Sequence, residues 1–364
     1  MTAGPPADIA AARRDLPACD AGRPVYMNIG GAGPMPRAAG RAVAEAMDRG
    51  MAEGRGSLPA VARAESLAGR VRAAAAALVG GRDDEVALTG NTTDGINIAL
   101  WGIDWRAGDE IVTTALEHPG VSVPVGVIAA RYGVRVHHIP AGEAHDALEA
   151  AVARRCGPRT RAVVLSHVAY GTGALLDAAG AEGGRVDAYA FPAHKWLYGP
   201  EGLGALWIRP DALERIRLSF SGYESGTGHA PDGGLRPHPG ARRHEASTPP
   251  TALLGGWLAA IEWLEAIGWD RVFSRIAAGR AAAADALTAI PGVRVLTPDG
   301  PRAGLVTFAI DGADPVRAAA TVARHGVVVR WLEHPPALRA SIGFHWSEGD
   351  IAALRDAVRA AAGC

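Results

Sequence analysis

Short apolar segments alternate with helical patterns through the first two thirds of the chain. Residues 162–166 form a continuous apolar run of the kind that builds buried parallel strands. We predict strands at 85–89, 110–114, 134–139, 162–166, 186–191 and 203–208, and helices at 59–78, 119–132 and 143–155. This alternation predicts an α/β fold whose doubly wound, mostly parallel sheet is covered by helices on both faces.

A smaller unit of mixed helices and strands follows. Residues 219–250 are rich in Gly, Pro and His, which is typical of an excursion from the core. The next helix contains Trp257, Trp263 and Trp269, which we interpret as packing residues. Beyond it we predict strands at 293–296, 305–310, 327–331 and 338–342, with helices starting near 315 and 348. The predicted organisation is a large domain over residues 1–275 and a small C-terminal α+β domain over residues 276–364.

Charge and cysteine usage exclude several classes of function. A formal net charge of −1 gives no electrostatic footprint for nucleic acid or an anionic membrane surface. No apolar run is long enough to span a bilayer, and the first residues lack the basic and apolar regions of a signal peptide. Cys19, Cys156 and Cys364 fit neither a disulfide framework nor a zinc site. We therefore expect a cytoplasmic protein with no metal, nucleic-acid or membrane partner.

The basic residues are distributed very unevenly between the two types. The chain contains 37 Lys and Arg residues together, yet Lys195 is the only lysine, and glutamine is absent. Arginine can replace lysine in surface ion pairs, but it cannot be deprotonated to attack a carbonyl carbon. Lys195 is therefore either a candidate for amine chemistry or a single lysine that escaped a coding bias on a loop.

Polar residues gather where the predicted strands end, and ligands of open α/β sheets bind at that edge. Asn91, Thr92 and Thr93 connect the strand at 85–89 to a helix. Their N–H groups and hydroxyls could cradle a phosphate at the helix N-terminus. The alternative is a well-capped helix that binds no ligand.

Two histidines and the lysine also follow predicted strands. The imidazole of His118 could stack on a flat aromatic ring or pack within its loop, and His167 presents the same two alternatives. His194 and Lys195 follow the strand at 186–191. This position places the only lysine in the expected crevice.

Five segments in this order resemble one enzyme family. They read NTTDGIN, ALEHPGV, AYAFPAHKWLYGPEGLGALW, HEASTPP and LRASIGFHWSEGDI. They are similar to the class V aminotransferase family of fold type I, which includes cysteine desulfurases, selenocysteine lyases and isopenicillin N epimerase-like enzymes. The resemblance runs from about Tyr26 to the end of the chain.

The resemblance implies a homodimeric enzyme that uses pyridoxal 5′-phosphate (PLP). Lys195 would form the internal aldimine and move a proton at the α-carbon of a small amino acid or amino-acid conjugate. Arg339 would clamp the substrate carboxylate, a task that suits its planar fork, although an ordinary ion pair within a strand is the alternative. Thr248 would reach the phosphate in the neighbouring subunit. The other residues that the family pattern implies are His118 stacked on the cofactor ring, Asn91, Thr92, Thr93, His167 and His194 around the cofactor, and Gly31 and Ala32 beside the substrate.

One interval departs from the family pattern. The family places an Asp on its own strand against the pyridine nitrogen, and that strand should lie within residues 168–185. A parallel crossover alone takes a dozen or more residues, so helix, strand and second connection cannot all fit. Either residues 175–179 form a shortened strand with Asp177 as the ring-nitrogen partner, or residues 172–179 begin the crossover helix and the strand is deleted. We favour the deletion, because it needs a single gap.

Smaller departures bear on the reaction. Pro192 replaces the family's phosphate-binding Ser, and His167 occupies a position where Asn is common. No Cys lies within 327–337, which argues against a persulfide-forming desulfurase because that step requires a thiolate. Epimerase-like, C–S lyase and aminotransferase chemistry remain open. The alternatives are a non-catalytic or impaired family member and a PLP-independent enzyme that uses His118 and His167 as acid and base.

Overall fold

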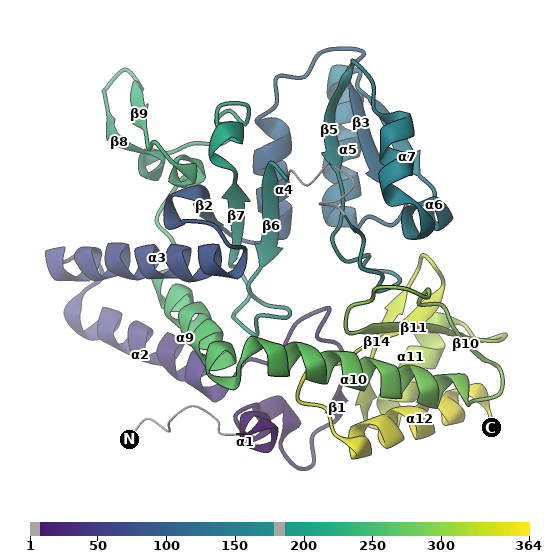
Figure 1. Cartoon of the computed structure of the whole chain (residues 1–364). Helices are drawn as coiled ribbons and strands as arrows, with labels where there is room; N and C mark the ends of the chain where they lie inside the picture. Colours follow the sequence, from purple (N-terminus) through teal and green to yellow (C-terminus); the bar gives the residue numbers. More distant parts are fainter. Residues whose placement is uncertain (1–7, 178–185) are drawn as a thin grey trace.

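The computed structural model describes residues 8–177 and 186–364 (Figure 1). A parallel sheet is built from three strands in the order β4-β3-β5, which are Arg135–Ile139, Glu110–Thr114 and Thr160–Val164. Ile111 faces α5 (Pro119–Tyr132), whereas Val112 faces α6 (Ala141–Asp146) and α7 (Leu148–Arg155). Helices therefore cover both faces of this sheet, as the alternating pattern predicts.

A second three-stranded sheet has the order β2-β7-β6. Its strands are Val86–Thr89, Gly204–Ile208 and Ala188–Pro192, and β7 runs antiparallel to both neighbours. One face packs on α3 (Leu58–Leu78) and α9 (Thr251–Ile267), with Trp257 fully buried between them. The helix α4 (Thr92–Trp101) covers the other face.

The described strands of the large domain form two separate three-stranded sheets (Figure 1). Within residues 8–177 and 186–364, β5 pairs only with β3 and β6 pairs only with β7, so no described strand lies between them. A hydrogen bond of 3.2 Å between His167 Nδ1 and the Tyr189 hydroxyl connects the two halves. The break lies where the family pattern places the strand that carries the Asp.

Neither alignment of the short interval matches its described part. Leu175 pairs back onto Val168 in an isolated antiparallel bridge, and Ala174 bridges to Arg302, so residues 172–177 form neither a sheet strand nor a helix. Residues 178 and 179 of both alignments lie outside the described residues. Asp177 is exposed and lies on no strand of either sheet. Its predicted position on a shortened central strand is therefore wrong.

The C-terminal part forms an antiparallel sheet in the order β10-β11-β14-β13. These strands are Val293–Val295, Leu305–Ile310, Ala337–Ser341 and Arg330–Leu332. The helices α10 (Trp269–Thr288), α11 (Pro315–Arg324) and α12 (Glu348–Ala362) enclose a shared apolar core. The predicted strand at 327–331 is divided, because β12 (Val327–Val328) pairs separately with β1 (Val25–Tyr26).

The N-terminal residues lie beside this small unit. Arg13, in α1 (Ile9–Arg14), forms a bidentate ion pair with Asp350 of α12. The predicted domain boundary at 275/276 falls inside α10 and stays a prediction. The other elements are α2 (Arg37–Glu53), which packs on α9, and the hairpin β8–β9 (Gly226–His229 and Leu235–Pro237) of the 219–250 excursion. Among the described residues, no helix combines the length and apolarity needed to cross a membrane.

Candidate active site

The start of α4 lies at the carboxyl end of β2. Asn91 is its N-cap, and its side-chain oxygen accepts the Asp94 N–H at 3.0 Å. The N–H groups of Thr92 and Thr93 belong to the first turn, where a helix offers no internal acceptor. This helix start therefore provides donors and a positive dipole end for an anion. The structure brings the three predicted cradle residues together here, and α4 packs beside α5.

His118 is the N-cap of α5. Its Nδ1 accepts the Gly120 N–H at 2.9 Å, which places the ring proton on Nε2. Burial lowers the pKa of His118, and the positive charges of Lys195, Arg339 and Arg330 lower it further. The imidazole is therefore neutral near pH 7 and lies within the field of the lysine and both arginines.

Lys195 lies in the turn between β6 and β7. The Gly33 N–H donates to the His194 carbonyl at 2.7 Å, and a Cβ at Gly33 would clash with the Lys195 carbonyl oxygen. The absence of a side chain at Gly33 thus allows the loop after β1 to pack against the lysine turn. Burial lowers the pKa of Lys195, and the charge of Arg339 adds to this effect. The Nδ1 atom of His194 is buried and has no partner among the described groups.

Arg339 enters the site from β14 and is only 4% exposed. Its Nη1 donates to the Tyr170 carbonyl at 2.7 Å, whereas its Nε has no acceptor in the described part of the chain. Burial and the directly opposite Arg330 lower the pKa of Arg339 to about 10. A Cβ at Gly30 would lie 3.3 Å from Arg339 Nη2, so the Gly30 backbone packs against the guanidinium. A buried, incompletely paired guanidinium of this kind suits a carboxylate ligand.

The loop of the predicted residues Gly31 and Ala32 lies beside these groups. The backbone of Gly31 rests on the Asn28 amide, and the Tyr26 hydroxyl donates to the Ala32 carbonyl at 2.7 Å. The Ser341 hydroxyl on β14 is buried without a partner among the described residues, and it also faces Gly30. The loop thus connects the lysine turn to the arginine on β14.

Sequence reasoning missed two residues of this site. Tyr170 contacts the His118 ring edge-to-face, with ring centroids 4.9 Å apart, and its carbonyl accepts from Arg339. Glu117 is 7% exposed and accepts from the Thr114 hydroxyl and from the N–H and hydroxyl of Ser166. A signal for Glu117 was available, because a carboxylate directly precedes His118 just beyond a buried strand. Tyr170 carried no such signal.

His167 and Thr248 bond to residues outside the lysine–arginine group. His167 is exposed and contacts Tyr189 of β6, while Tyr170 occupies the place between His118 and Arg339. Thr248 is also exposed, and its hydroxyl and N–H bond to the Tyr223 hydroxyl. The predicted cofactor contacts of His167 and Thr248 stay predictions.

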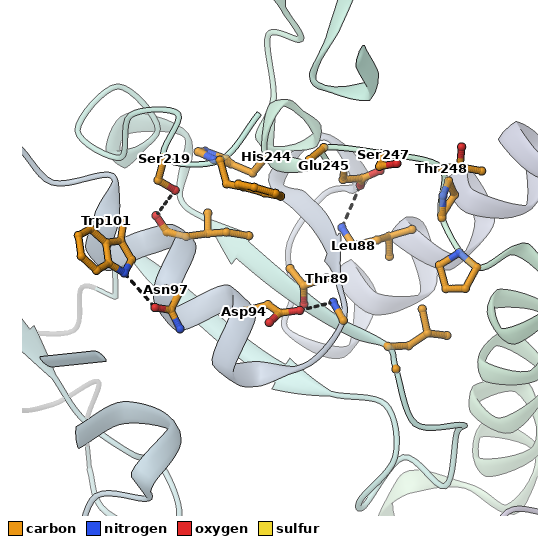
Figure 2. A pocket seen from close by; sticks show the side chains of 18 residues that line it. Leu88, Thr89, Asp94, Asn97, Trp101, Ser219, His244, Glu245, Ser247 and Thr248 are labelled. Atoms are coloured by element: carbon orange, nitrogen blue, oxygen red, sulfur yellow. Dashed lines mark hydrogen bonds between the residues drawn. The ribbon is translucent and has the colours of Figure 1, made fainter. Parts of the chain in front are cut away.

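Thr248 lines a separate cavity of about 530 Å³ between α4 and the 219–250 excursion. Figure 2 shows Ser219 and His244 of the excursion facing Asp94 and Asn97 of α4. His244 is 3% exposed, and neither ring nitrogen has a partner in the described part of the chain. Burial and the neighbouring Arg243 lower the pKa of His244 to about 4, so this ring is neutral near pH 7.

The donor set fits PLP in three respects. The start of α4 and the free His194 Nδ1 suit a phosphate, the half-buried amine of Lys195 suits the aldehyde, and Arg339 suits an amino-acid carboxylate. The charged groups that shift the pKa of Lys195 and His118 are all cations, as expected for a site that receives anions. Fold and site together define a PLP-dependent enzyme of fold type I.

Comparison with known proteins identifies the family. The aminotransferase class-V family matches residues 25–181 and 181–354, so the chain belongs to this family. The two matched stretches meet at residue 181, which lies outside the described residues, in the interval between β5 and β6. The chain is a PLP-dependent enzyme with amino-acid chemistry, as the sequence predicts.

The relatives cover more than one reaction. A probable cysteine desulfurase of Pseudomonas aeruginosa is 30% identical over 319 residues, which span 74% of this chain and 76% of the relative. The isopenicillin N epimerase of Streptomyces clavuligerus is 29% identical over 397 residues, covering 93% and 95%. This alignment is longer than the 364-residue chain, so the epimerase has segments without a counterpart here.

Solved structures of the cystine C–S lyase C-DES resemble the chain closely. A C-DES mutant with glycine covalently linked to the PLP cofactor has a TM-score of 0.89 and 28% identity, covering 95% of this chain and 98% of that one. The complex of C-DES with its product cysteine persulfide has a TM-score of 0.88, with 93% and 98% covered. The prediction of a fold type I architecture is confirmed.

Proposed function

We propose that the chain is a C–S lyase that cleaves a small sulfur-containing amino acid, with PLP attached through Lys195. The observation that carries this proposal is the position of the only lysine, half-buried and in the field of Arg339, beside a phosphate cradle. The resemblance to the cystine C–S lyase C-DES supports the reaction class. The absence of Cys from residues 327–337 separates it from enzymes that carry sulfur on a loop cysteine.

Each residue of the site has its own role in the proposed reaction. The first-turn N–H groups of α4 and His194 would hold the phosphate, and the neutral His118 ring would pack on the cofactor ring. Arg339 binds the substrate α-carboxylate and thereby orients the α-carbon toward Lys195. PLP, when bound, supplies an electron sink conjugated to that carbon. Burial favours the neutral amine of Lys195, which can then take the α-proton as a general base.

The short interval between β5 and β6 supports elimination over transamination, because residues 168–185 are too few for a crossover helix, a strand and a second connection. The family's carboxylate at the pyridine nitrogen strengthens the electron sink, and no described strand lies between β5 and β6 to carry it. A weaker sink disfavours reactions that accumulate negative charge at the α-carbon. Loss of a good leaving group such as a thiolate from the β-carbon removes that charge as it develops, so a C–S substrate suits this site best.

Epimerisation is the second candidate function. It is supported by the isopenicillin N epimerase, which matches 93% of this chain. Reprotonation of the α-carbon would return an amino acid of the opposite configuration and would release no sulfur compound. The two candidates are therefore distinguished by product.

We also propose that two copies form a homodimer that shares its active sites. Thr248 is exposed on the excursion, where a second copy can reach it. Phe220 and Tyr223 of the excursion are 73% and 54% exposed, as expected for aromatic residues that a second copy covers. The substrate is a small amino acid. A cytoplasmic location stays the expectation from the sequence.

The first test is the visible absorption of purified protein titrated with PLP. We expect a band that Lys195→Ala and Lys195→Arg both abolish, with borohydride fixing the cofactor on the peptide that contains Lys195. The arginine variant keeps the charge and thus isolates the amine chemistry. Cystine should then yield pyruvate and a persulfide. Exchange of the α-hydrogen without pyruvate would favour the epimerase, and the absence of any band would favour the non-catalytic alternative.

A further inference from the structure

Tyr198 has an unusual backbone conformation three residues after Lys195. Its φ of 55° lies in the left-handed region, and no other non-glycine residue in the described part of the chain has a positive φ. The side chain is fully buried and packs against the rings of Trp263 and Phe344. A bulky residue persists in this conformation only where its surroundings impose it, and such residues concentrate at functional sites.

The phenol of Tyr198 bonds to the small C-terminal unit. Its hydroxyl lies 3.2 Å from His345 Nδ1. His345 is 3% exposed, and burial together with the charge of Arg13 lowers its pKa to about 3, so the ring is neutral near pH 7. A neutral ring with its proton on Nε2 leaves Nδ1 free to accept the phenol proton. His345 follows β14, the strand that carries Arg339.

The backbone of Tyr198 bonds to the lysine turn. Its N–H donates to the Lys195 carbonyl at 3.1 Å, and the next N–H, of Gly199, donates to the Ala193 carbonyl at 2.9 Å. Gly33 donates to His194 from the other side of the turn. The lysine turn is thus closed by its own backbone, and the Tyr198 phenol connects it to the unit that carries the arginine.

We propose that Tyr198 is a positioning residue whose bond to His345 maintains the left-handed conformation that directs the Lys195 amine into the site. Arg339 lies on β14, and His345 follows that strand in the chain. The bond between Tyr198 and His345 therefore also fixes the position of the Lys195 amine relative to the Arg339 guanidinium. The proposal deepens the proposed function and rests on it. The test measures the chemical reactivity of the Lys195 amine and requires no catalytic turnover.

The chain's single lysine makes the measurement unambiguous. Full-length protein without cofactor is acetylated by an N-hydroxysuccinimide ester across a pH series, and peptide mass spectrometry reports the rate at Lys195. The midpoint of this profile reports the pKa of the amine, which lies in the field of Arg339 and beside His118. Tyr198→Phe removes only the hydroxyl. We expect its midpoint to rise by about one pH unit, because a released amine is better hydrated.

Matched variants separate positioning from stability. Thr297→Val removes a buried hydroxyl that accepts the Thr307 N–H in the small unit, and it should leave the midpoint unchanged at a similar cost in stability. His345→Asn retains an acceptor near the Nδ1 position and should rescue the wild-type midpoint, whereas His345→Leu should reproduce the shift. These two variants test the proposal even if Tyr198→Phe fails to fold.

Equal midpoints for Tyr198→Phe and wild type would overturn the proposal, as would a comparable shift in Thr297→Val. A shift confined to Tyr198→Phe and His345→Leu would support it. If PLP never attaches to Lys195 but the shift is present, the proposed function fails while the positioning role stands.

Discussion

Cations dominate the charges that act on Lys195 and His118. Arg339 and Arg330 lie directly opposite each other on adjacent strands, and the charges of both lower the pKa of His118. Like charges placed so close destabilise a sheet unless an anion compensates them. A phosphate on the α4 cradle and a carboxylate on Arg339 would supply that compensation, so the residues are arranged for two anionic groups.

Arg339→Lys should weaken amino-acid use about 100-fold in kcat/KM, because an ammonium group cannot form the two parallel bonds of a guanidinium fork. Steady-state kinetics, together with the spectral change on amino-acid binding, measures the effect. Arg294→Lys is the matched control, since Arg294 forms an exposed ion pair with Asp311 far from the site. Equal losses in both variants would argue against a carboxylate at Arg339.

His244→Phe should leave the free energy of unfolding at pH 7 unchanged or raise it by about 1 kcal/mol, because the imidazole is buried with no hydrogen-bond partner among the described residues. The folded pKa of His244, about 4, lies below the usual value of about 6.5. The unfolded chain therefore binds the extra proton, and stability is full above pH 6.5 and falls by about 1.4 kcal/mol per pH unit toward pH 4.

Urea unfolding of wild type and His244→Phe at pH 7 and pH 5 tests this prediction. The variant should lose less stability between the two pH values than the wild type. A strong loss of stability at pH 7 would instead show that His244 has a partner in the assembled protein.

The described strands of the two sheets of the large domain differ in how fully they are paired. β3 and β7 are paired on both sides, whereas β5 and β6 each have one open edge among the described residues. In β6, the odd-numbered residues form the backbone hydrogen bonds to β7, and the Ala193 N–H continues this pattern by donating to the Leu203 carbonyl. The N–H groups of the even-numbered residues Ala188 and Ala190 therefore point toward the open edge. Such edges are usually covered or paired in native sheets.

Amide hydrogen exchange should reveal this asymmetry. Peptides from β5 and β6 should exchange at least about tenfold faster than peptides from β3 and β7, because unpaired amides contact solvent without local unfolding. Within the small sheet, the doubly paired β11 serves as an internal standard. Equal protection of β6 and β7 would mean that another part of the protein covers the open edge.

At the scale of the whole molecule, we propose that two copies of the chain complete each active site. The site contains the α4 cradle, Arg339 and the 219–250 excursion. On this proposal, Thr248→Val alone should weaken PLP binding roughly tenfold or more, since it would remove a hydroxyl that bonds to the charged phosphate of the partner's cofactor. Mixing the Lys195→Ala and Thr248→Val variants distinguishes a shared site from a site within one chain. A mixed dimer with shared sites contains one intact site and one doubly defective site.

PLP titration of a refolded equimolar mixture should therefore recover wild-type affinity in about a quarter of the sites, which is the statistical share of intact ones. Neither variant alone should show such sites. If the mixture behaves as the sum of its two components, Thr248 does not act across the interface.

Local sequence patterns specified most elements well. The predicted strands at 110–114 and 305–310 and the helix at 119–132 match β3, β11 and α5 at both ends. A buried apolar run, a proline at a helix start and a glycine after a helix end are signals that neighbouring residues carry by themselves. The sequence also provided three features of the site, namely the single lysine, the strand-end position of His118 and the order of the five motifs.

The tertiary structure decided what depends on residues far apart in the sequence. The length of the interval 168–185 showed that the family pattern could not fit, but only strand pairing showed two half-sheets joined by His167 and Tyr189. Tyr170 and His345 join the site because the small C-terminal unit packs against the strand ends. Composition and periodicity record local preference and burial, whereas a contact between β14 and the lysine turn depends on how the whole chain packs.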